Sequence, residues 1–169
     1  MADLLDEIET CVPALRRYAR ALTRDADRAD DLVQDCLERA IRKRGLFVSP
    51  GTVRGWLYRI LVNLWRNQNR AQRRRGDHMG LDEMIVEPSV PAAQHGRIAL
   101  GEMSRAIDKL PADQREVLLL VALEGISYGE VATILDIPAG TVMSRLSRAR
   151  ATLRTLTGNG DEPRLRSVK

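Results

Sequence analysis

The chain of 169 residues has few of the residue types on which disulfide-bonded and metal-binding proteins depend. It contains two Cys, two His and a single Phe, and aromatic residues make up only 4% of it. Cys11 and Cys36 have the spacing of neither a disulfide framework nor a zinc site, so we expect two buried, reduced thiols. The acidic start and the lack of a long apolar run predict a soluble cytoplasmic protein without membrane insertion.

The sequence also lacks the motifs of the common catalytic sites. It has no Gly-rich phosphate loop, no nucleophile elbow, no cluster of metal ligands and no pair of carboxylates in an apolar setting. We therefore expect no enzymatic activity, no cofactor and no metal. What remains is a chain with 44% hydrophobic residues, enough for packed helices, and a net charge of +4 that is unevenly distributed.

Residues 124–156 predict two short helices joined by a tight turn. Ser127 and Glu130 have the spacing of a capping box at the start of the first helix. Asp136 stands where the chain must turn and tolerates a positive φ, and Pro138 suits the start of the second helix. The second helix repeats apolar residues at the spacing of a buried stripe: Val142, Leu146, Ala149 and Leu153.

The opposite face of that second helix is small, polar and basic, with Met143, Ser144, Ser147, Arg148 and Ala151. Residues 139–156 contain four Arg and no acid. This is the layout of a helix-turn-helix, whose second helix enters the DNA major groove. Small residues let the backbone approach base edges, Arg can make paired hydrogen bonds to guanine, and the amides of Gly140 and Thr141 can meet a phosphate. The pattern leaves open a solvated basic face on an ordinary helical hairpin.

The first part of the chain predicts two helices, one over residues 3–23 and one over residues 28–44. Pro13 lies within the first, which therefore starts near that residue or bends there. The second is expected to bury Val33, Leu37, Ala40 and Ile41. Its other face presents Asp31, Gln34, Asp35 and Glu38. That acidic face is either a solvated surface or a docking face for a basic or polar protein partner.

A loop over residues 45–52 leads into a long helix over residues 52–75. Phe47, in the loop, is either a lid on the core or an exposed contact. The helix contains seven Arg and no acid, interleaved with Asn, Gln and aromatic residues. This composition suits a nucleic-acid backbone and unstacked bases, although a helix of this kind can also lie on a membrane or a partner protein.

The remaining segments complete an all-α organisation of two small helical domains. We predict a first domain over residues 1–75, an acidic flexible linker over 76–95, a second domain over 96–157 and a disordered tail over 158–169. In the second domain, Pro111 separates two further helices that support the helix-turn-helix. The first of the two is marked by Leu100, Met103, Ile107 and Leu110.

Taken together, the two halves resemble a known bacterial family. The first half contains DADRADDLVQDCLERAI and WLYRILVNLWRNQNRAQRRR. The second contains LPADQREVLLLVALEGISYGEVATILDIPAGTVMSRLSRARATLR. The chain resembles the sigma factors of the extracytoplasmic-function (ECF) group, group IV of the sigma-70 family, over nearly its whole length apart from the linker and the tail.

This resemblance implies a role for each surface. The loop over residues 45–52 corresponds to the family loop that captures a flipped base of the −10 promoter element. Residues implied in −10 binding are Phe47, Arg59, Asn63, Arg66, Asn67 and Arg70. Residues implied in −35 binding are Gly140, Thr141, Met143, Ser144, Arg145, Ser147 and Arg148, with Arg145 and the two amides serving phosphates. Residues implied in polymerase binding are Asp31, Gln34, Asp35 and Glu38.

The implied partners are the RNA polymerase core, through its largest-subunit clamp and its flap region, promoter DNA, and an anti-sigma factor packed against or between the domains. Two other functions are open to the sequence. One is a stand-alone helix-turn-helix regulator that binds as a dimer, which does not explain the acidic or the Arg-rich helix. The other is a sigma-like decoy that occupies an anti-sigma factor without binding promoters.

Overall fold

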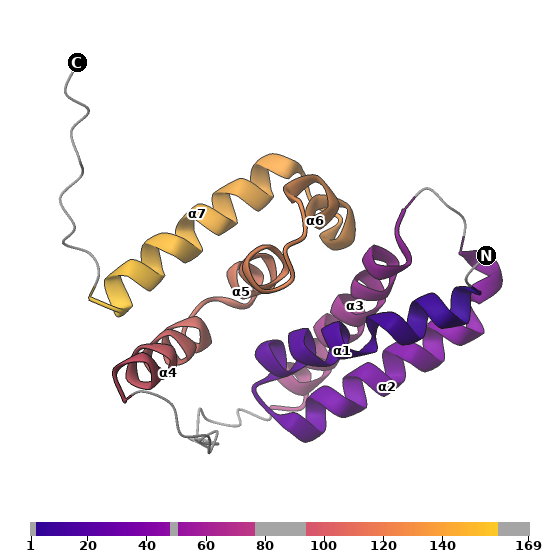
Figure 1. The fold of residues 1–169 in the computed structure, drawn as a ribbon, viewed down its shortest axis with the longest axis horizontal. Coiled ribbons are helices and arrows are strands. Elements are labelled where there is room, and N and C mark those ends of the chain that lie inside the picture. The colour runs from indigo at the N-terminus through magenta and orange to yellow at the C-terminus, as the bar shows by residue number, and fades with distance from the viewer. Residues whose placement is uncertain (1–2, 48–50, 77–93, 159–169) are drawn as a thin grey trace.

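A computed structural model describes residues 3–47, 51–76 and 94–158, with only the backbone of residues 94–99. These residues form helices and no strand. In chain order they are α1 (Leu4–Thr23), α2 (Ala26–Arg42), α3 (Val53–Arg74), α4 (Gln94–Asp108), α5 (Ala112–Leu118), α6 (Tyr128–Leu135) and α7 (Ala139–Leu156). Figure 1 shows α1, α2 and α3 grouped on one side and α4 to α7 on the other. The predicted all-α fold of two helical units is confirmed.

The first unit is a three-helix bundle in which each helix contacts the other two. Its core consists of aliphatic and tyrosine side chains that are almost fully buried: Leu15, Tyr18, Leu22, Leu32, Leu57, Tyr58 and Leu61. Helix α1 begins at Leu4 and continues through Pro13, so the helix does not start at that residue. Asp3 and Asp6 form the capping box at its start.

Helix α2 corrects one residue of the predicted core. Asp25 caps the helix by accepting a hydrogen bond from the Arg28 amide, and Cys36 and Ala40 are buried. Ile41, expected to be buried, is 43% exposed. The buried positions of α2, which include the neighbours Leu32 and Val33, lie on one side of the helix and end at Ala40, and Ile41 lies about 100° further round.

Both cysteines are free thiols. Cys36 is buried and its Sγ lies 3.4 Å from the Leu57 carbonyl oxygen, so the expectation of a buried thiol is confirmed for this residue. Burial raises the pKa of the Cys36 thiol to about 12. Cys11 is only half-buried, and burial also raises its pKa.

The second unit is built on a helix that widens into a π-helical turn. Helix α5 continues without a break into this turn, Leu119–Leu123, whose amides bond five residues back, as in the bond from the Glu124 N–H to the Leu119 carbonyl. Gly125, with φ 66°, ends the segment. Helix α6 then follows, capped by the Ser127 oxygen, which accepts a hydrogen bond from the Glu130 amide.

The turn and the second helix of the predicted helix-turn-helix are confirmed in detail. Asp136 has φ 55°, in the left-handed region that its position required. The four residues of the predicted stripe on α7 are all buried: Val142, Leu146, Ala149 and Leu153. The capping box is only half formed, because the Glu130 carboxylate accepts a hydrogen bond from Thr52 of the first unit, 2.8 Å away, in place of one from Ser127.

Three predicted segments lie partly or wholly outside the described residues. These are the centre of the loop over residues 45–52, most of the acidic linker and most of the tail. On α4, which follows the linker, Leu110 is buried just past the helix end, whereas Leu100 is 73% exposed. None of the helices in the described part of the chain is apolar over enough length to cross a bilayer.

The core of the first unit gives a direct test of the fold. Leu61 is fully buried, so Leu61→Ala removes packed methyl groups and is expected to lower the free energy of unfolding by about 2–5 kcal/mol. Ile41→Ala, at the exposed position, should cost less than about 1 kcal/mol. Urea unfolding followed by tryptophan fluorescence measures both, because the two Trp lie on α3. Equal losses would contradict the packing.

Candidate nucleic-acid interface

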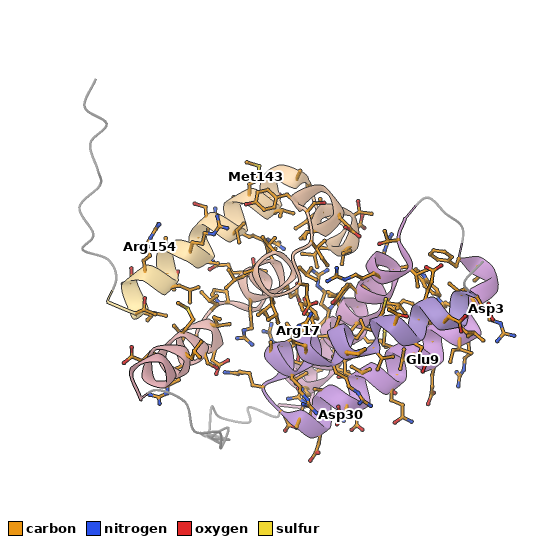
Figure 2. The ribbon with its side chains drawn as sticks, in the orientation of Figure 1. Asp3, Glu9, Arg17, Asp30, Met143 and Arg154 are labelled. Carbon is orange, nitrogen blue, oxygen red and sulfur yellow. The ribbon has the colours of Figure 1, made fainter. Side chains whose placement is uncertain are left out.

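The outward face of α7 presents the side chains that the helix-turn-helix predicts. Met143 is 56% exposed, and Ser144, Ser147 and Arg148 are exposed as well. Figure 2 shows Met143 and Arg154 projecting from the side of α7 that faces away from the rest of the molecule. The helix is held in this orientation because its opposite stripe packs on α5 and α6. Small and basic groups therefore lie together on a convex helical surface.

The start of α7 departs from the prediction at one amide. The Thr141 N–H donates to the Pro138 carbonyl at 3.0 Å, so this amide is not free to meet a phosphate. The first turn is tightened by a bond of the 3₁₀ type, which uses a donor that an α-helix leaves unpaired. Among the described residues the Gly140 N–H has no such bond, and it remains available at the positive end of the helix dipole.

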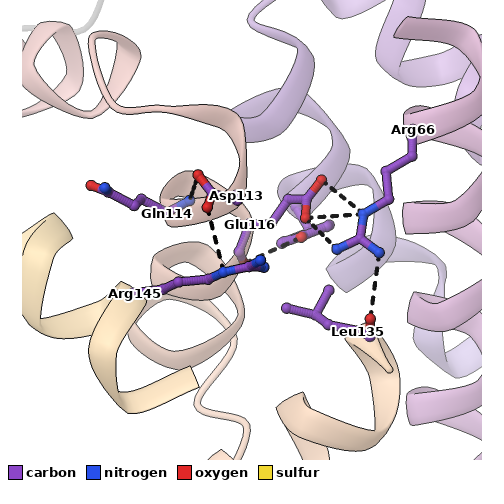
Figure 3. A network of polar contacts seen from close by, with 7 residues as sticks. Arg66, Asp113, Gln114, Glu116, Leu135 and Arg145 are labelled. Atoms are coloured by element: carbon purple, nitrogen blue, oxygen red, sulfur yellow. Dashed lines mark hydrogen bonds and ion pairs between the residues drawn. The ribbon is translucent and has the colours of Figure 1, made fainter. Parts of the chain in front are cut away.

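Arg145 does not share the outward face. Its Nε lies 3.4 Å from Oδ2 of Asp113 on α5, and its side chain is only 23% exposed. The reason is its register, because Arg145 follows Val142 by three residues and directly precedes Leu146, both of which are buried. It lies at the edge of the buried stripe, beside the second unit's own carboxylate (Figure 3).

Helix α2 presents the predicted acidic face to solvent. Asp31, Gln34, Asp35 and Glu38 are all exposed. Gln34 and Glu38 interact along the helix, with Nε2 and Oε1 3.5 Å apart, and Arg42 lies 3.7 Å from Glu38. In the described residues no ion pair involves Asp31 or Asp35, so these two exposed carboxylates have no charged partner within the chain there.

The residues predicted for the −10 element separate into three groups on α3 and the loop before it. Arg59, Asn63, Asn67 and Arg70 are exposed. Phe47 is half-buried and its ring lies 5.1 Å from the Trp56 ring, so it packs as a lid on the core. Arg66 is different again, since it turns toward the second unit.

Arg66 contacts both α5 and the end of α6. Its Nη2 lies 2.7 Å from Oε2 of Glu116, its Nε lies 3.2 Å from the same oxygen, and Nη1 donates to the Leu135 carbonyl at 3.4 Å. The side chain of Arg66 is 27% exposed and that of Glu116 is 4% exposed. Figure 3 shows this arginine reaching from the first unit to the carboxylate of the second.

A groove of about 500 Å³ separates the two units beside this contact. One wall comes from α3, with Arg59, Asn63, Arg66 and Arg70. The facing wall comes from the second unit and includes Asp113, Glu116, Asp136 and Arg145. The structure thus brings together arginines that the sequence assigned to two separate surfaces, and it places carboxylates among them.

A second contact between the units centres on Glu124, which the sequence analysis did not single out. Its carboxylate is fully buried and accepts hydrogen bonds from Arg17 Nη2 at 2.7 Å, from the Tyr58 hydroxyl at 2.7 Å and from Arg54 Nη2 at 3.2 Å. Burial, together with the hydrogen bond to Glu124, raises the pKa of the Tyr58 hydroxyl. The sequence did carry a signal for this contact, because Glu124 directly follows an apolar run that is expected to be buried. A carboxylate buried there requires hydrogen-bonding or charged partners.

The chemistry available at these surfaces is that of binding. The described residues contain no group of three or more His, Cys, Asp or Glu side chains placed to hold a metal ion. The exposed face of α7 and the exposed part of α3 combine guanidinium, amide and hydroxyl groups, the donors that contact phosphates and base edges.

Comparison with known proteins identifies relatives of both units. A family model described as the sigma2 domain of PhyR matches residues 8–62, and a model of sigma-70 region 4 matches residues 100–153. The ECF RNA polymerase sigma factor EcfG of Rhodopseudomonas palustris is 40% identical over 153 residues, which are 90% of this chain and 84% of that protein. The ECF RNA polymerase sigma-E factor of Escherichia coli is 35% identical over 131 residues, 71% of this chain and 69% of the relative.

A solved structure matches the whole arrangement of helices. It is that of the sigma factor RpoE in complex with the anti-sigma factor NepR, from Bartonella quintana. The match has a TM-score of 0.77 and 36% sequence identity, and it covers 96% of this chain and 100% of the solved chain.

Proposed function

Because the chain belongs to the ECF RNA polymerase sigma factors, we propose that its first unit opens the −10 element and its second unit binds the −35 element. The observation that supports this division most directly is α7, with an exposed face of small and basic residues over a fully buried stripe. The corresponding domains are residues 1–75 and 96–157, joined by the linker over 76–95 and followed by the tail from residue 158. A sigma factor supplies promoter choice and strand separation, and the polymerase supplies the catalysis.

In the proposed −35 complex, α7 lies in the major groove. Ser144 and Ser147 allow the helix backbone to approach the bases, and Arg148 is placed to bond guanine through two donors. Met143 can contact a thymine methyl group but offers no hydrogen-bond donor to guanine. The base preferred at this position should therefore differ from the one that an Arg or Lys there would prefer. The free Gly140 amide supports a phosphate contact at the helix start.

In the proposed −10 complex, α3 contacts DNA with its exposed arginine and amide side chains. Unstacking costs a few kcal/mol per step, and capture of an extruded base offsets part of that cost. Asn63 lies on the exposed side of α3 in the middle of the helix, and Arg59, Asn67 and Arg70 extend the same surface. Phe47 supports the base of the loop through its packing on Trp56.

The acidic face of α2 is proposed to dock on the clamp of the largest polymerase subunit, and the second unit on the flap region. Two unpaired, exposed carboxylates at i and i+4 suit a basic protein surface. The relative RpoE is bound by the anti-sigma factor NepR, and we propose an anti-sigma partner for this chain as well, packed against or between the units. A polymerase partner implies that the protein acts in the cytoplasm.

The two other functions considered from the sequence have less support. A stand-alone helix-turn-helix regulator gives no role to the exposed acidic face of α2 or to the Arg-rich α3. The decoy has one observation in its favour, since the family model that matches residues 8–62 is that of PhyR, and the PhyR of Bartonella quintana is an anti-anti-sigma factor solved in complex with the anti-sigma factor NepR. A decoy has no use for an exposed basic recognition face, and run-off transcription from a cognate promoter separates it from a sigma factor.

The −35 assignment predicts a change in base preference. Arg148→Ala is expected to weaken promoter binding by about 1–3 kcal/mol and to relax discrimination at one base position, because the paired donors to guanine are lost. The measurement is binding of the polymerase–factor complex to a mapped promoter carrying each of the four bases at each −35 position. Arg154→Ala, also an exposed arginine of α7, is the matched control and should leave base preference intact. Unchanged preference in Arg148→Ala would contradict the groove assignment.

The α2 assignment predicts a loss of polymerase affinity without loss of fold. Reversing the charges in Asp31→Arg and Asp35→Arg should weaken binding to core polymerase by about tenfold or more, since two attractive contacts become repulsive. Affinity is measured by fluorescence anisotropy of the labelled factor with core enzyme. The double variant Glu9→Arg and Glu102→Arg makes the same change of net charge at exposed positions outside this face. If both double variants bind alike, α2 is not the docking surface.

A further inference from the structure

The C-terminal end of α3, residues 67–74, contains no buried side chain. The buried residues of the helix end at Trp65, and those beyond it are half-buried or exposed. The segment includes Asn67 and Arg70, two of the side chains that we propose contact DNA. A helix end with few buried apolar contacts opens locally at a low free energy unless other contacts hold it. The contacts that fix its direction therefore affect its use as a DNA-binding surface.

Gln72 links this segment to the start of α2. Its Oε1 accepts a hydrogen bond from Nη2 of Arg28 at 3.2 Å. In the described structure no other side chain of residues 67–74 forms a hydrogen bond or an ion pair. The guanidinium of Arg28 also lies over the ring of Trp65, with Cζ 5.6 Å from the ring centroid. One side chain of α2 thus contacts α3 at its last buried residue and again near its end.

The position of Arg28 is one that helix electrostatics disfavour. Arg28 lies in the first turn of α2, at the positive end of the helix dipole, where acids are stabilising and cations are not. It is the single base of residues 25–38, which contain six acids. Despite these neighbours Arg28 forms no ion pair in the described part of the chain, and its guanidinium contacts α3 instead. The contact with α3 is therefore the physical role that the structure gives to this cation.

Trp65 provides a fixed surface for the stacked guanidinium. It is 6% exposed, and its indole N–H has no hydrogen-bond partner among the described residues. The ring is therefore held by packing and by the cation over its face, a place that suits Arg because its guanidinium is planar and weakly hydrated. Since the same guanidinium bonds Gln72, a rigid core residue is connected to the loosely packed end of the helix.

The end of α3 lies far from the loop that precedes the helix. Arg70 follows the cap residue Thr52 by 18 residues (52 to 70), which is about 27 Å at 1.5 Å for each residue. DNA that contacts the loop and Arg70 together must extend over this distance. Binding groups generally need supporting contacts that hold them to within about 0.5 Å of their working positions. The direction of the helix end therefore decides whether both contacts form at once.

We propose that Arg28 is a positioning residue for the proposed −10 surface. By stacking on Trp65 and bonding Gln72, it holds the end of α3 so that Asn67 and Arg70 meet the DNA duplex while the start of the helix meets the separated strand. Arg28 acts through these two residues and makes no contact with DNA itself. The proposal rests on the function proposed above, since that function assigns α3 to promoter DNA.

Hydrogen exchange of the full-length factor without DNA tests the anchor. Arg28→Ala is expected to speed amide exchange in residues 67–75 by about tenfold, the combined effect of losing a cation–π contact and a charge-assisted hydrogen bond. Exchange in residues 57–62, within the buried part of α3, should stay unchanged. Arg16→Ala is the matched control, because it removes the same charge from an exposed residue of α1 whose nearest carboxylate, that of Asp30, is 4.0 Å away.

A second variant guards against a folding defect in the first. Gln72 is half-buried near the helix end, and Gln72→Ala should speed exchange in the same segment by a smaller factor, since the stacking of Arg28 on Trp65 remains. In the double variant the increase should be smaller than the product of the two single increases, because the two residues share one contact. Unchanged exchange in both single variants overturns the proposal, and so do effects that multiply.

The same variants, assembled with core polymerase, test the contact with DNA. Two probes from a mapped promoter are compared: a fork, in which a duplex continues into a single −10 strand, and the single −10 strand alone. Arg28→Ala should weaken binding to the fork by about threefold or more and lower the slope of log K against log salt by about 1, because one phosphate contact is lost. Binding to the single strand should stay unchanged, and Arg16→Ala should change neither.

Gln72→Ala separates positioning from a direct contact of Arg28 with DNA. This variant changes no charge and should still weaken binding to the fork, by less than Arg28→Ala. If only Arg28→Ala weakens it, Arg28 contacts DNA directly and the positioning role is wrong. Faster exchange in residues 67–75 without weaker binding to the fork also overturns the proposal, as does an equal loss with both probes.

The same data separate this proposal from the proposed function. If the wild-type complex binds neither probe and gives no run-off transcript, the assignment of α3 to promoter DNA is wrong and the positioning role is wrong with it. If the wild-type complex transcribes while Arg28→Ala leaves the exchange of residues 67–75 unchanged, only the positioning role is wrong.

Discussion

The buried Glu124 carboxylate is the interaction on which the arrangement of the two helical units depends. It accepts bonds from residues of α1 and α3 that lie far from it in sequence, with Arg17 separated from it by 107 positions. The buried apolar side chains of the two units form one cluster, so these bonds to Glu124 orient the units where their apolar surfaces already meet. Because the contact between the units uses Arg54 and Arg66, α3 carries both arginines that hold the second unit and arginines that we propose bind DNA.

The separation of charge along the chain explains how one small protein presents several surfaces. Acidic residues gather on α2 and basic ones on α3 and α7, and two acids of α5, Asp113 and Glu116, line a groove together with arginines of α3 and α7. If both units bind promoter DNA as proposed, the two contacts reinforce each other, because the second contact forms at a high effective concentration. This gain in affinity requires that the distance between the two units can adjust to the distance between their sites on the DNA and the polymerase.

Much of this structure was predictable from the sequence, and the exceptions share a physical cause. The all-α fold, the buried stripe of α7 and the left-handed Asp136 follow from periodicity and local backbone preferences, which act within a helix or a turn. The exposure of Ile41 and the carboxylate pairing of Arg66 and Arg145 depend on which other helix covers each surface. Periodicity shows which face of a helix is apolar and which is polar. It does not show that a carboxylate far away in the sequence will contact the polar face. The centre of the −10 loop lies outside the described residues, so its predicted base pocket stays a prediction.

The π-helical turn at the end of α5 has a consequence for the direction in which Glu124 points. A π turn contains roughly one residue more than the 3.6 of an α-helical turn, so each residue beyond it is rotated relative to a regular continuation. In an unbroken α-helix the Glu124 side chain would leave the axis at a different azimuth and would not face Arg17 and Tyr58. The alignment of the two halves of the protein therefore depends on a local irregularity of the backbone, and deletion of a single residue between Leu119 and Leu123 would redirect the Glu124 carboxylate away from Arg17 and Tyr58.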